Sequence, residues 1–258
     1  MENEIKIEMT NYFDNTEYLI FSSHKTATQS LSKTLNHHNL TTIHFHICKD
    51  LLERHVFYEW SDNSIQQKYI LSHIKQYCIQ NKKRLKIISI IRNPHDRLIA
   101  SFFQRLHNGE IIHENKNEKH TTIMSCTDTE LINRYNYMIK NDRLMGRFES
   151  LDQISSMFET DIIKELKFKD DYYYYENKWI ELYVLDFNRV INDTLEYVNK
   201  ILKLNLRENI ITNLSNKKIY YEKYLRIKEI VKKDKELYGI VKDKYNPFYF
   251  QAFEKNIK

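Results

Sequence analysis

Glycine and proline are almost missing from this chain, which has 3 Gly and 2 Pro in 258 residues. No glycine lies between Met1 and Asn108. The Walker A phosphate loop, GxxxxGK[ST], needs glycines and places its lysine late. The composition therefore disfavours a nucleoside triphosphatase of that type. Long apolar runs are missing as well, since no stretch approaches the roughly 20 residues that span a bilayer.

Cysteine is also scarce, and Cys48, Cys78 and Cys126 have no CxxC spacing. This favours a reducing compartment with structural thiols. The start, MENEIKIEMTNYF, is acidic and lacks the apolar core of a secretory signal. We expect a cytoplasmic protein without a transmembrane segment. The formal net charge of +5 would help to collect an anionic ligand. The lysines are scattered, however, so we expect no nucleic-acid partner.

Apolar runs and helical patterns alternate along the chain, which predicts an α/β fold with a mostly parallel sheet. The length suits one elaborated domain. The C-terminal third is predicted to be helical again. The expected strands are 18–22, 41–47, 85–92 and 179–187, and the expected helices are 30–39, 64–81, 129–140 and 148–166. Ligands of such sheets bind at the carboxyl ends of strands, and two of these ends carry unusual residues.

The first is YLIFSSHKTATQSLSKTL, residues 18–35, where a predicted strand becomes a helix. A helix N-terminus favours an anion through its unpaired N–H groups and its dipole. Lys25 adds a point charge there, and Thr26, Thr28 and Ser30 can add hydroxyl donors. The alternative is that Thr28 or Ser30 only caps the helix and that Lys25 is a surface lysine.

The second is IIRNPHDRLIASFFQ, residues 90–104. Arg92 leaves a predicted strand, Asn93 is a plausible helix cap and Pro94 suits the first helical turn. A guanidinium and a hydroxyl that converge on a phosphate monoester form a sound anion site. The alternative is an ordinary capped helix with Arg92 in a surface salt bridge.

The two motifs together resemble those of sulfotransferases that use 3′-phosphoadenosine 5′-phosphosulfate (PAPS). HKTATQSL resembles their 5′-phosphosulfate loop, and residues 90–104 look like their 3′-phosphate motif. The resemblance implies that Lys25 contacts the bridging oxygen and the sulfonate, while the backbone of Thr26 to Ser30 holds the 5′-phosphate. The implied cofactor-binding residues are His24, Lys25, Thr26, Ala27, Thr28, Gln29, Ser30, Arg92 and Ser101.

One position departs from the family pattern. The family places a serine eight residues after the arginine, where this chain has Ala100 and then Ser101. Neighbouring residues on a helix point about 100° apart. Either a local adjustment brings Ser101 into place, or the 3′-phosphate relies on Arg92 and other donors.

Further stretches are similar to capsular polysaccharide synthesis proteins of bacteria. ASFFQRL is similar to their Ser-Ala-Phe-Phe-Gln stretch, with the first two residues exchanged. NKKIYYEKYLRIKEIV and DKYNPFYF are similar to their Lys-Trp-Tyr and His-Phe-Tyr segments, with Ile219 for the Trp and Pro247 for the His.

This resemblance implies a PAPS-dependent carbohydrate O-sulfotransferase with a glycan acceptor in capsular or surface polysaccharide biosynthesis. Its fold would be a three-layer P-loop-like domain over residues 1–258, with a helical insertion at 110–178 on the acceptor side. It is also compatible with a peripheral contact with membrane-bound polysaccharide machinery.

Sulfonyl transfer needs a base near the acceptor hydroxyl, and histidine suits that role near neutral pH. IHFH places His44 and His46 on the same side of a predicted strand. We prefer His46 over His44, with His24 as a third candidate beside Lys25. A Glu base, as in other sulfotransferases, stays open. A zinc pair would need a third ligand, which we do not recognise, and we expect no metal.

Two other functions stay open. A phosphotransferase would need a magnesium carboxylate after a strand, which Asp186 could supply. A non-catalytic scaffold in polysaccharide assembly is suggested by the displaced serine. The charged stretch 228–244, KEIVKKDKELYGIVKDK, is predicted to be a solvated, salt-bridged helix face.

Overall fold

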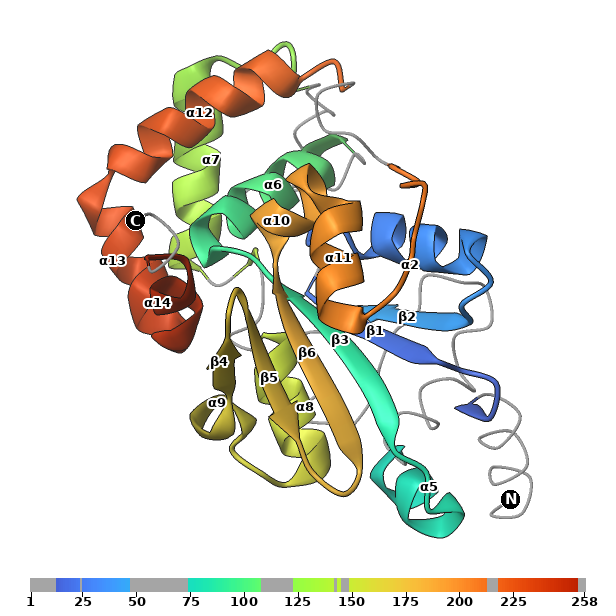
Figure 1. The fold of residues 1–258 in the computed structure, drawn as a ribbon. Helices are drawn as coiled ribbons and strands as arrows, with labels where there is room; N and C mark the ends of the chain where they lie inside the picture. The colour runs from blue at the N-terminus through green and yellow to red at the C-terminus, as the bar shows by residue number, and fades with distance from the viewer. Residues whose placement is uncertain are drawn as a thin grey trace, which may run out of the picture. The chain divides into compact units, whose positions relative to one another are not determined.

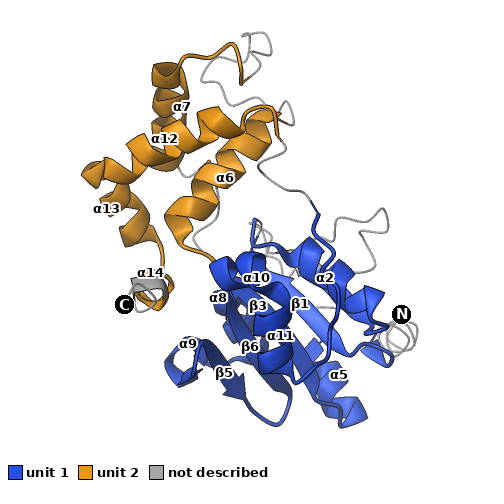
Figure 2. Cartoon of the chain, turned by 45° about the horizontal axis from the view of Figure 1, so that its top comes forward, with its two compact units in different colours: residues 1–91, 148–212 blue, residues 92–147, 213–258 orange. Residues whose placement is uncertain are grey.

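The computed structural model describes residues 13–23, 25–46, 74–107, 123–141, 143–144, 149–212 and 218–254. The chain divides into two compact units, shown in Figure 2. Unit 1 comprises residues 1–91 and 148–212, and unit 2 comprises residues 92–147 and 213–258. In the described part of the chain, no helix is long and apolar enough to cross a membrane.

Unit 1 is built on a six-stranded sheet with the order β2-β1-β3-β6-β5-β4 (Figure 1). The pairs β1–β2, β1–β3 and β3–β6 are parallel, whereas β6–β5 and β5–β4 are antiparallel. The predicted α/β fold with a mostly parallel sheet is therefore confirmed. The strands are β1 (Tyr18–Ser22), β2 (Thr42–His46), β3 (Leu85–Ile91), β4 (Lys167–Lys169), β5 (Tyr172–Glu176) and β6 (Ile180–Asp186).

Helices cover both faces of this sheet. Ile88 and Ile90 of β3 belong to a core cluster with side chains of α2 and α11. Ser89 lies between them and so points to the opposite face, where its hydroxyl is hydrogen-bonded to that of Ser150, the first residue of α8, at 2.7 Å. The helices of unit 1 are α2 (Thr28–His37), α5 (Ile74–Asn81), α8 (Ser150–Phe158), α9 (Ile162–Glu165), α10 (Phe187–Asn192) and α11 (Thr194–Leu202).

The strand order reverses at β1. The chain passes from β1 through α2 to β2 on one side, and β3 then pairs with the other side of β1. Ligands of open α/β sheets bind in the crevice outside the carboxyl ends of the strands at such a point. The loop that follows β1 therefore begins at the edge where this topology favours a ligand.

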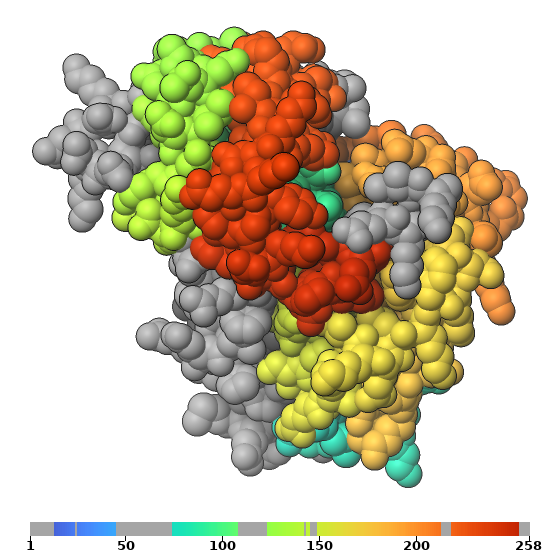
Figure 3. Space-filling view, turned by 90° about the vertical axis from the view of Figure 1, so that its left-hand side faces the viewer, coloured from blue at the N-terminus to red at the C-terminus, as the bar shows by residue number. Residues whose placement is uncertain are grey.

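Unit 2 is helical, and its core combines the apolar sides of α6, α7, α12 and α13. Figure 3 shows α7 beside α12 and α13. Thr127 caps α7 with a capping box, and the side chain of Asp234 caps α13. The helices of unit 2 are α6 (Pro94–His107), α7 (Asp128–Lys140), α12 (Tyr221–Lys233), α13 (Lys235–Lys244) and α14 (Phe248–Glu254).

Two predicted intervals differ in detail from the structure. The helix expected over 148–166 is two helices, because α8 ends at Phe158 and its C-cap residue, Glu159, is left-handed with φ 52°. The interval 110–178, expected to be a helical insertion, also contains β4 and β5. The alternation of the tyrosines in 170–179 is typical of a half-buried strand, and this segment forms β5, which pairs with β6 and β4. Of the helix expected over 64–81, residues 74–81 form α5, and the rest lies outside the described residues.

Candidate functional site

The carboxyl end of β1 is tied firmly to its neighbour β3. The hydroxyl of Ser22 donates to the carbonyl oxygen of Ile90 at 3.0 Å and accepts the backbone N–H of the same residue. Ile90 is the penultimate residue of β3, so both parallel strands end at nearly the same level. The loop that leads from β1 to α2 thus starts from a fixed point of the sheet.

The loop itself adopts a backbone that usually calls for glycine. Lys25 and Ala27 have φ values of 65° and 61°. The left-handed conformation costs a residue with a Cβ about 1–2 kcal/mol. Thr26, between them, is buried and its hydroxyl donates to the carbonyl oxygen of Ser23 at 2.5 Å. Strained residues of this kind cluster at ligand sites, and turns of left-handed residues can form concave anion-binding surfaces.

The start of α2 receives no side-chain cap. Its N-cap residue is Ala27, and no side-chain cap hydrogen bond is made there. The alternative in which Thr28 or Ser30 caps the helix is therefore wrong, because both residues lie inside α2. Backbone N–H groups at the start of a helix are donors from which an anion can accept hydrogen bonds.

The loop hydroxyls are mostly engaged inside the protein. Ser30 donates to the carbonyl oxygen of Thr212 at 3.2 Å and accepts the Thr212 N–H at 3.0 Å. Thr26 donates to Ser23, and the side chain of Thr28 is buried. A hydroxyl has one hydrogen to donate. The hydroxyl hydrogens of Thr26 and Ser30 are therefore already used inside the protein, so an anion at this loop would have to be bound by backbone N–H groups and by Lys25.

The other predicted cofactor-binding residues of the loop differ in what the structure describes. Lys25, Ala27 and Gln29 are half-buried. His24 lies outside the described residues. Its predicted contact with the cofactor therefore stays a prediction, together with its role as the third candidate base.

A buried carboxylate that the sequence analysis missed lies at the same end of β1. Glu149 is 4% exposed, and its carboxylate accepts a hydrogen bond from the hydroxyl of Ser23. Glu149 is also the N-cap residue of α8, where its backbone N–H donates to the Asp152 carboxylate at 2.8 Å. The spacing of Glu149 and Asp152 was the one sequence signal, because a carboxylate at N3 is typical of a helix start.

The two histidines that are candidates for the base, His44 and His46, lie at different positions along β2. His46 is in register with Ser22, the last residue of β1, and His44 is in register with Ile20. The backbone therefore places His46 nearer to the level of the loop than His44. The side chain of His46 lies outside the described part of the chain.

The second predicted motif belongs to unit 2. Arg92 directly follows β3, is half-buried and forms a hydrogen bond with Tyr224 of α12. Burial lowers the pKa of its guanidinium, which the phenol oxygen of Tyr224 partly offsets.

The structure distinguishes Ala100 from Ser101 on α6. Ala100 packs against the core of unit 2. Ser101 is 5% exposed, and its hydroxyl has no hydrogen-bond partner among the described residues. Serines inside helices commonly bond the carbonyl one turn back. The hydroxyl of Ser101 is thus buried, and its contact with the 3′-phosphate stays a prediction.

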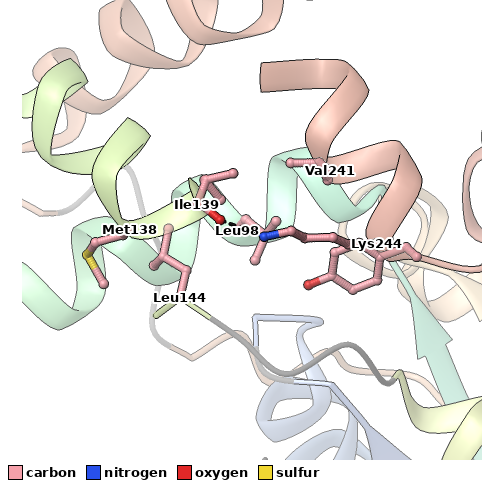
Figure 4. A pocket seen from close by; sticks show the side chains of 7 residues that line it. Leu98, Met138, Ile139, Leu144, Val241 and Lys244 are labelled. Atoms are coloured by element: carbon pink, nitrogen blue, oxygen red, sulfur yellow. Dashed lines mark hydrogen bonds between the residues drawn. The ribbon is translucent and has the colours of Figure 1, made fainter. Parts of the chain in front are cut away.

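Two other features make weaker candidates. Asp186 lies at the end of β6, where its carboxylate accepts the Asn188 N–H at 2.6 Å and caps α10. Figure 4 shows a hollow in unit 2 lined mainly by apolar side chains, among them Leu98 and Val241. The Lys244 ammonium there donates to the Ile139 carbonyl oxygen at 2.7 Å. Asp186 thus has a structural role, and the hollow lacks an arrangement of donors for an anion.

Comparison of the chain with protein-family models, with curated proteins and with solved structures finds no match. The functional argument therefore rests on the motifs and on the geometry of each unit.

Proposed function

We propose that this protein is a PAPS-dependent sulfotransferase that transfers a sulfonate group to a hydroxyl of a glycan in capsular or surface polysaccharide biosynthesis. The proposal includes a three-layer P-loop-like fold. The observation that carries it is the loop between β1 and α2, at the carboxyl edge of the sheet. In this loop Lys25 and Ala27 are both left-handed, and Ala27, the N-cap residue of α2, makes no side-chain cap hydrogen bond.

In this proposal the backbone of Thr26 to Ser30 holds the 5′-phosphate at the start of α2. A dianion there is stabilised by the helix dipole and by N–H donors. The acceptor oxygen forms a bond to sulfur while the bond from sulfur to the bridging oxygen breaks. The Lys25 ammonium stabilises the negative charge that develops on the leaving phosphate.

The proton of the acceptor hydroxyl goes to a histidine on β2. His46 is preferred because it is in register with the last residue of β1. We expect His46→Ala to lower turnover by about 100-fold or more, since general bases contribute roughly 10²–10⁴. The affinity for 3′,5′-adenosine bisphosphate should stay unchanged, and His44→Ala is the matched control. Near-normal turnover of the His46→Ala protein would contradict this assignment.

Arg92 is proposed to bind the 3′-phosphate. Its guanidinium can donate two parallel hydrogen bonds to a phosphate monoester. The unpartnered hydroxyl of Ser101 would serve as a further donor. Ala100 occupies the position at which the family has its serine, so Arg92 carries the proposed 3′-phosphate contact and Ser101 adds to it.

Calorimetric titration with 3′,5′-adenosine bisphosphate tests the proposal. We expect magnesium-independent binding by the wild type, and about tenfold or greater weakening by both Lys25→Ala and Arg92→Ala, as charge-assisted contacts predict. Lys33→Ala, on the exposed side of α2, is the control and should leave the affinity unchanged.

The same titration decides between this proposal and the alternatives. If the folded wild type fails to bind, sulfotransferase activity is excluded and the non-catalytic scaffold is favoured. Binding of ATP that requires magnesium, lost in Asp186→Asn, would favour the phosphotransferase.

A further inference from the structure

One face of α2 binds an irregular segment that comes after α11 in the chain. We call this segment, residues 207–212, the strap, and Figure 1 shows it in orange beside α2. Ser30, Thr34 and the C-cap residue His38 follow one another at intervals of four residues and so share the face that meets the strap. The strap ends at Thr212, where the chain passes from unit 1 into unit 2. It is therefore the last part of unit 1 before one of the connections to unit 2.

Two hydroxyls of this face bind the middle and the end of the strap. Ser30 donates to the carbonyl oxygen of Thr212 at 3.2 Å and accepts the N–H of the same residue at 3.0 Å. The buried hydroxyl of Thr34 donates to the side-chain oxygen of Asn209 and accepts the N–H of Ile210, both at 2.9 Å. Each hydroxyl thus acts as donor and as acceptor. Neither hydroxyl changes its charge near neutral pH, so these bonds do not depend on pH there.

The start of the strap is bound by an imidazole instead. Nδ1 of His38 lies 2.9 Å from the carbonyl oxygen of Thr34, so this nitrogen must carry the hydrogen of that bond. Nε2 then has a lone pair, and it accepts the backbone N–H groups of Arg207 at 2.9 Å and of Glu208 at 3.3 Å. These partners assign the neutral imidazole with its hydrogen on Nδ1. A protonated imidazole carries a hydrogen on both nitrogens and can accept neither N–H group.

We propose that His38 is a pH-sensitive clasp, which holds the start of the strap when its imidazole is neutral and releases it when the imidazole is protonated. Histidine is the side chain whose charge ordinarily changes between pH 5 and 8. Arg207 and Glu208 are exposed, so water can accept their N–H groups after release. Release is thus a local opening of the strap and leaves the sheet of unit 1 folded. The clasp does not depend on the proposed sulfotransferase activity.

The charged groups beside His38 come from α2 and from the strap. The ring of His37 meets the ring of His38 edge to face at 5.3 Å, and its Nε2 lies 3.3 Å from the carboxylate of Glu208. A protonated His37 attracts Glu208 and so opposes release of the strap. The side chains of this pair are 50% and 67% exposed, however, so their attraction is weak. Arg207 adds a positive charge at the same end of the strap, so the balance of these groups favours release at acidic pH.

The residue before the strap serves as an internal reference. Leu206 is buried, its N–H donates to the side-chain oxygen of Asn199 at 2.7 Å, and its carbonyl oxygen accepts the amide of Asn199 at 2.9 Å. An amide side chain does not titrate near neutral pH, so these two bonds should be the same at pH values on either side of the histidine transition. The bonds to His38 therefore lie between two anchors that do not titrate, Asn199 before them and Thr34 after them.

Hydrogen exchange of the full chain, followed by NMR at about pH 7.5 and about pH 5, tests the clasp. Each rate is divided by the rate of an unstructured chain at the same pH, which removes the intrinsic dependence of exchange on pH. We expect the protection of the Arg207 and Glu208 N–H groups to fall about three- to tenfold at the lower pH, as the loss of a hydrogen bond predicts. The protection of the Leu206 N–H should not change. Equal protection of Arg207 and Glu208 at both pH values would overturn the proposal.

Two variants separate His38 from the other titrating groups. Glutamine does not titrate, so in His38→Gln the protection of the Arg207 and Glu208 N–H groups should be the same at both pH values. His37→Gln is the matched control. It keeps the clasp and should lose at least as much protection at the lower pH as the wild type, because the attraction between residue 37 and Glu208 is gone. A wild-type pH dependence in His38→Gln, or no pH dependence in His37→Gln, would contradict the proposal.

Discussion

The hydroxyl of Ser23 donates a hydrogen bond to the carboxylate of Glu149, and both side chains are buried. The two residues are 126 positions apart in the chain. Ser23 begins the loop after β1, and Glu149 is the N-cap residue of α8. The loop is thus anchored to the start of a helix that packs against β3. Glu149 is a positioning residue for the loop rather than a group proposed to touch a ligand.

We therefore expect Glu149→Ala to lower the free energy of unfolding by about 2–3 kcal/mol, because a buried hydroxyl loses its charged acceptor. Urea denaturation measures this loss. Glu149→Gln should cost less, since the amide oxygen can still accept the hydrogen bond. Glu196→Ala, at an exposed position of α11, is the control and should change stability by less than about 0.5 kcal/mol. A Glu149→Ala protein as stable as this control would show that the bond to Ser23 contributes nothing.

The strained backbone at Ala27 leads to a second prediction. Ala27→Gly should raise the free energy of unfolding by about 0.5–1 kcal/mol, because glycine removes the left-handed penalty and only part of that gain is lost to a freer unfolded chain. Lys33→Gly, at a right-handed position of α2, should instead lower it by about 1 kcal/mol. Thermal and urea denaturation of both variants check the opposite signs. Destabilisation by Ala27→Gly would argue against strain at this position.

Substitution of Ser30 should change the free energy of unfolding but not ligand affinity, whereas substitution of Lys25 should change ligand affinity but not the free energy of unfolding. Ser30→Ala removes the hydrogen bonds with Thr212, so we expect a loss of about 1–2 kcal/mol in the free energy of unfolding. Its affinity for 3′,5′-adenosine bisphosphate should be unchanged, because the hydroxyl hydrogen already serves Thr212. Lys25→Ala should show the reverse pattern. A large loss of affinity in Ser30→Ala, measured calorimetrically, would show that the Ser30 hydroxyl does donate to the ligand.

The carboxylate of Asp96 should make the free energy of unfolding depend on pH. Its pKa in the folded protein lies below its usual value, since Lys228 and Lys232 outweigh burial. The ionised carboxylate therefore stabilises the fold above its unfolded pKa of about 3.9, and this contribution is lost as the pH falls through the folded pKa. Asp96→Asn should cost about 2 kcal/mol at pH 7 and progressively less below about pH 4. Urea denaturation of both proteins at pH 7 and pH 3 tests this, and an equal difference at both values would contradict it.

The helical and strand segments could be predicted from the sequence because their signals are local. The apolar run 85–91 is β3, in the interior of the sheet, and Arg92 follows it directly, as the pattern of residues 85–104 predicts. The segment 18–22 is β1, and α2 begins at Thr28, within two residues of its predicted start. Strand β4 was not separated from the surrounding helices, because its three residues form a strand only by pairing with β5.

The side-chain partners were decided by tertiary structure alone. Local spacing predicted that Lys25 and Ser30 bind an anion, but only the folded chain brings Thr212 to the hydroxyl of Ser30. Helical periodicity does not show which face a second helix covers, so the sequence could not show that Lys228, only 21% exposed, pairs with Asp96 of α6. Composition and local pattern thus determined the α/β class and the residues at the two strand ends. Long-range packing decided which hydroxyls at these strand ends bond inside the protein and which charges share the half-buried carboxylate of Asp96.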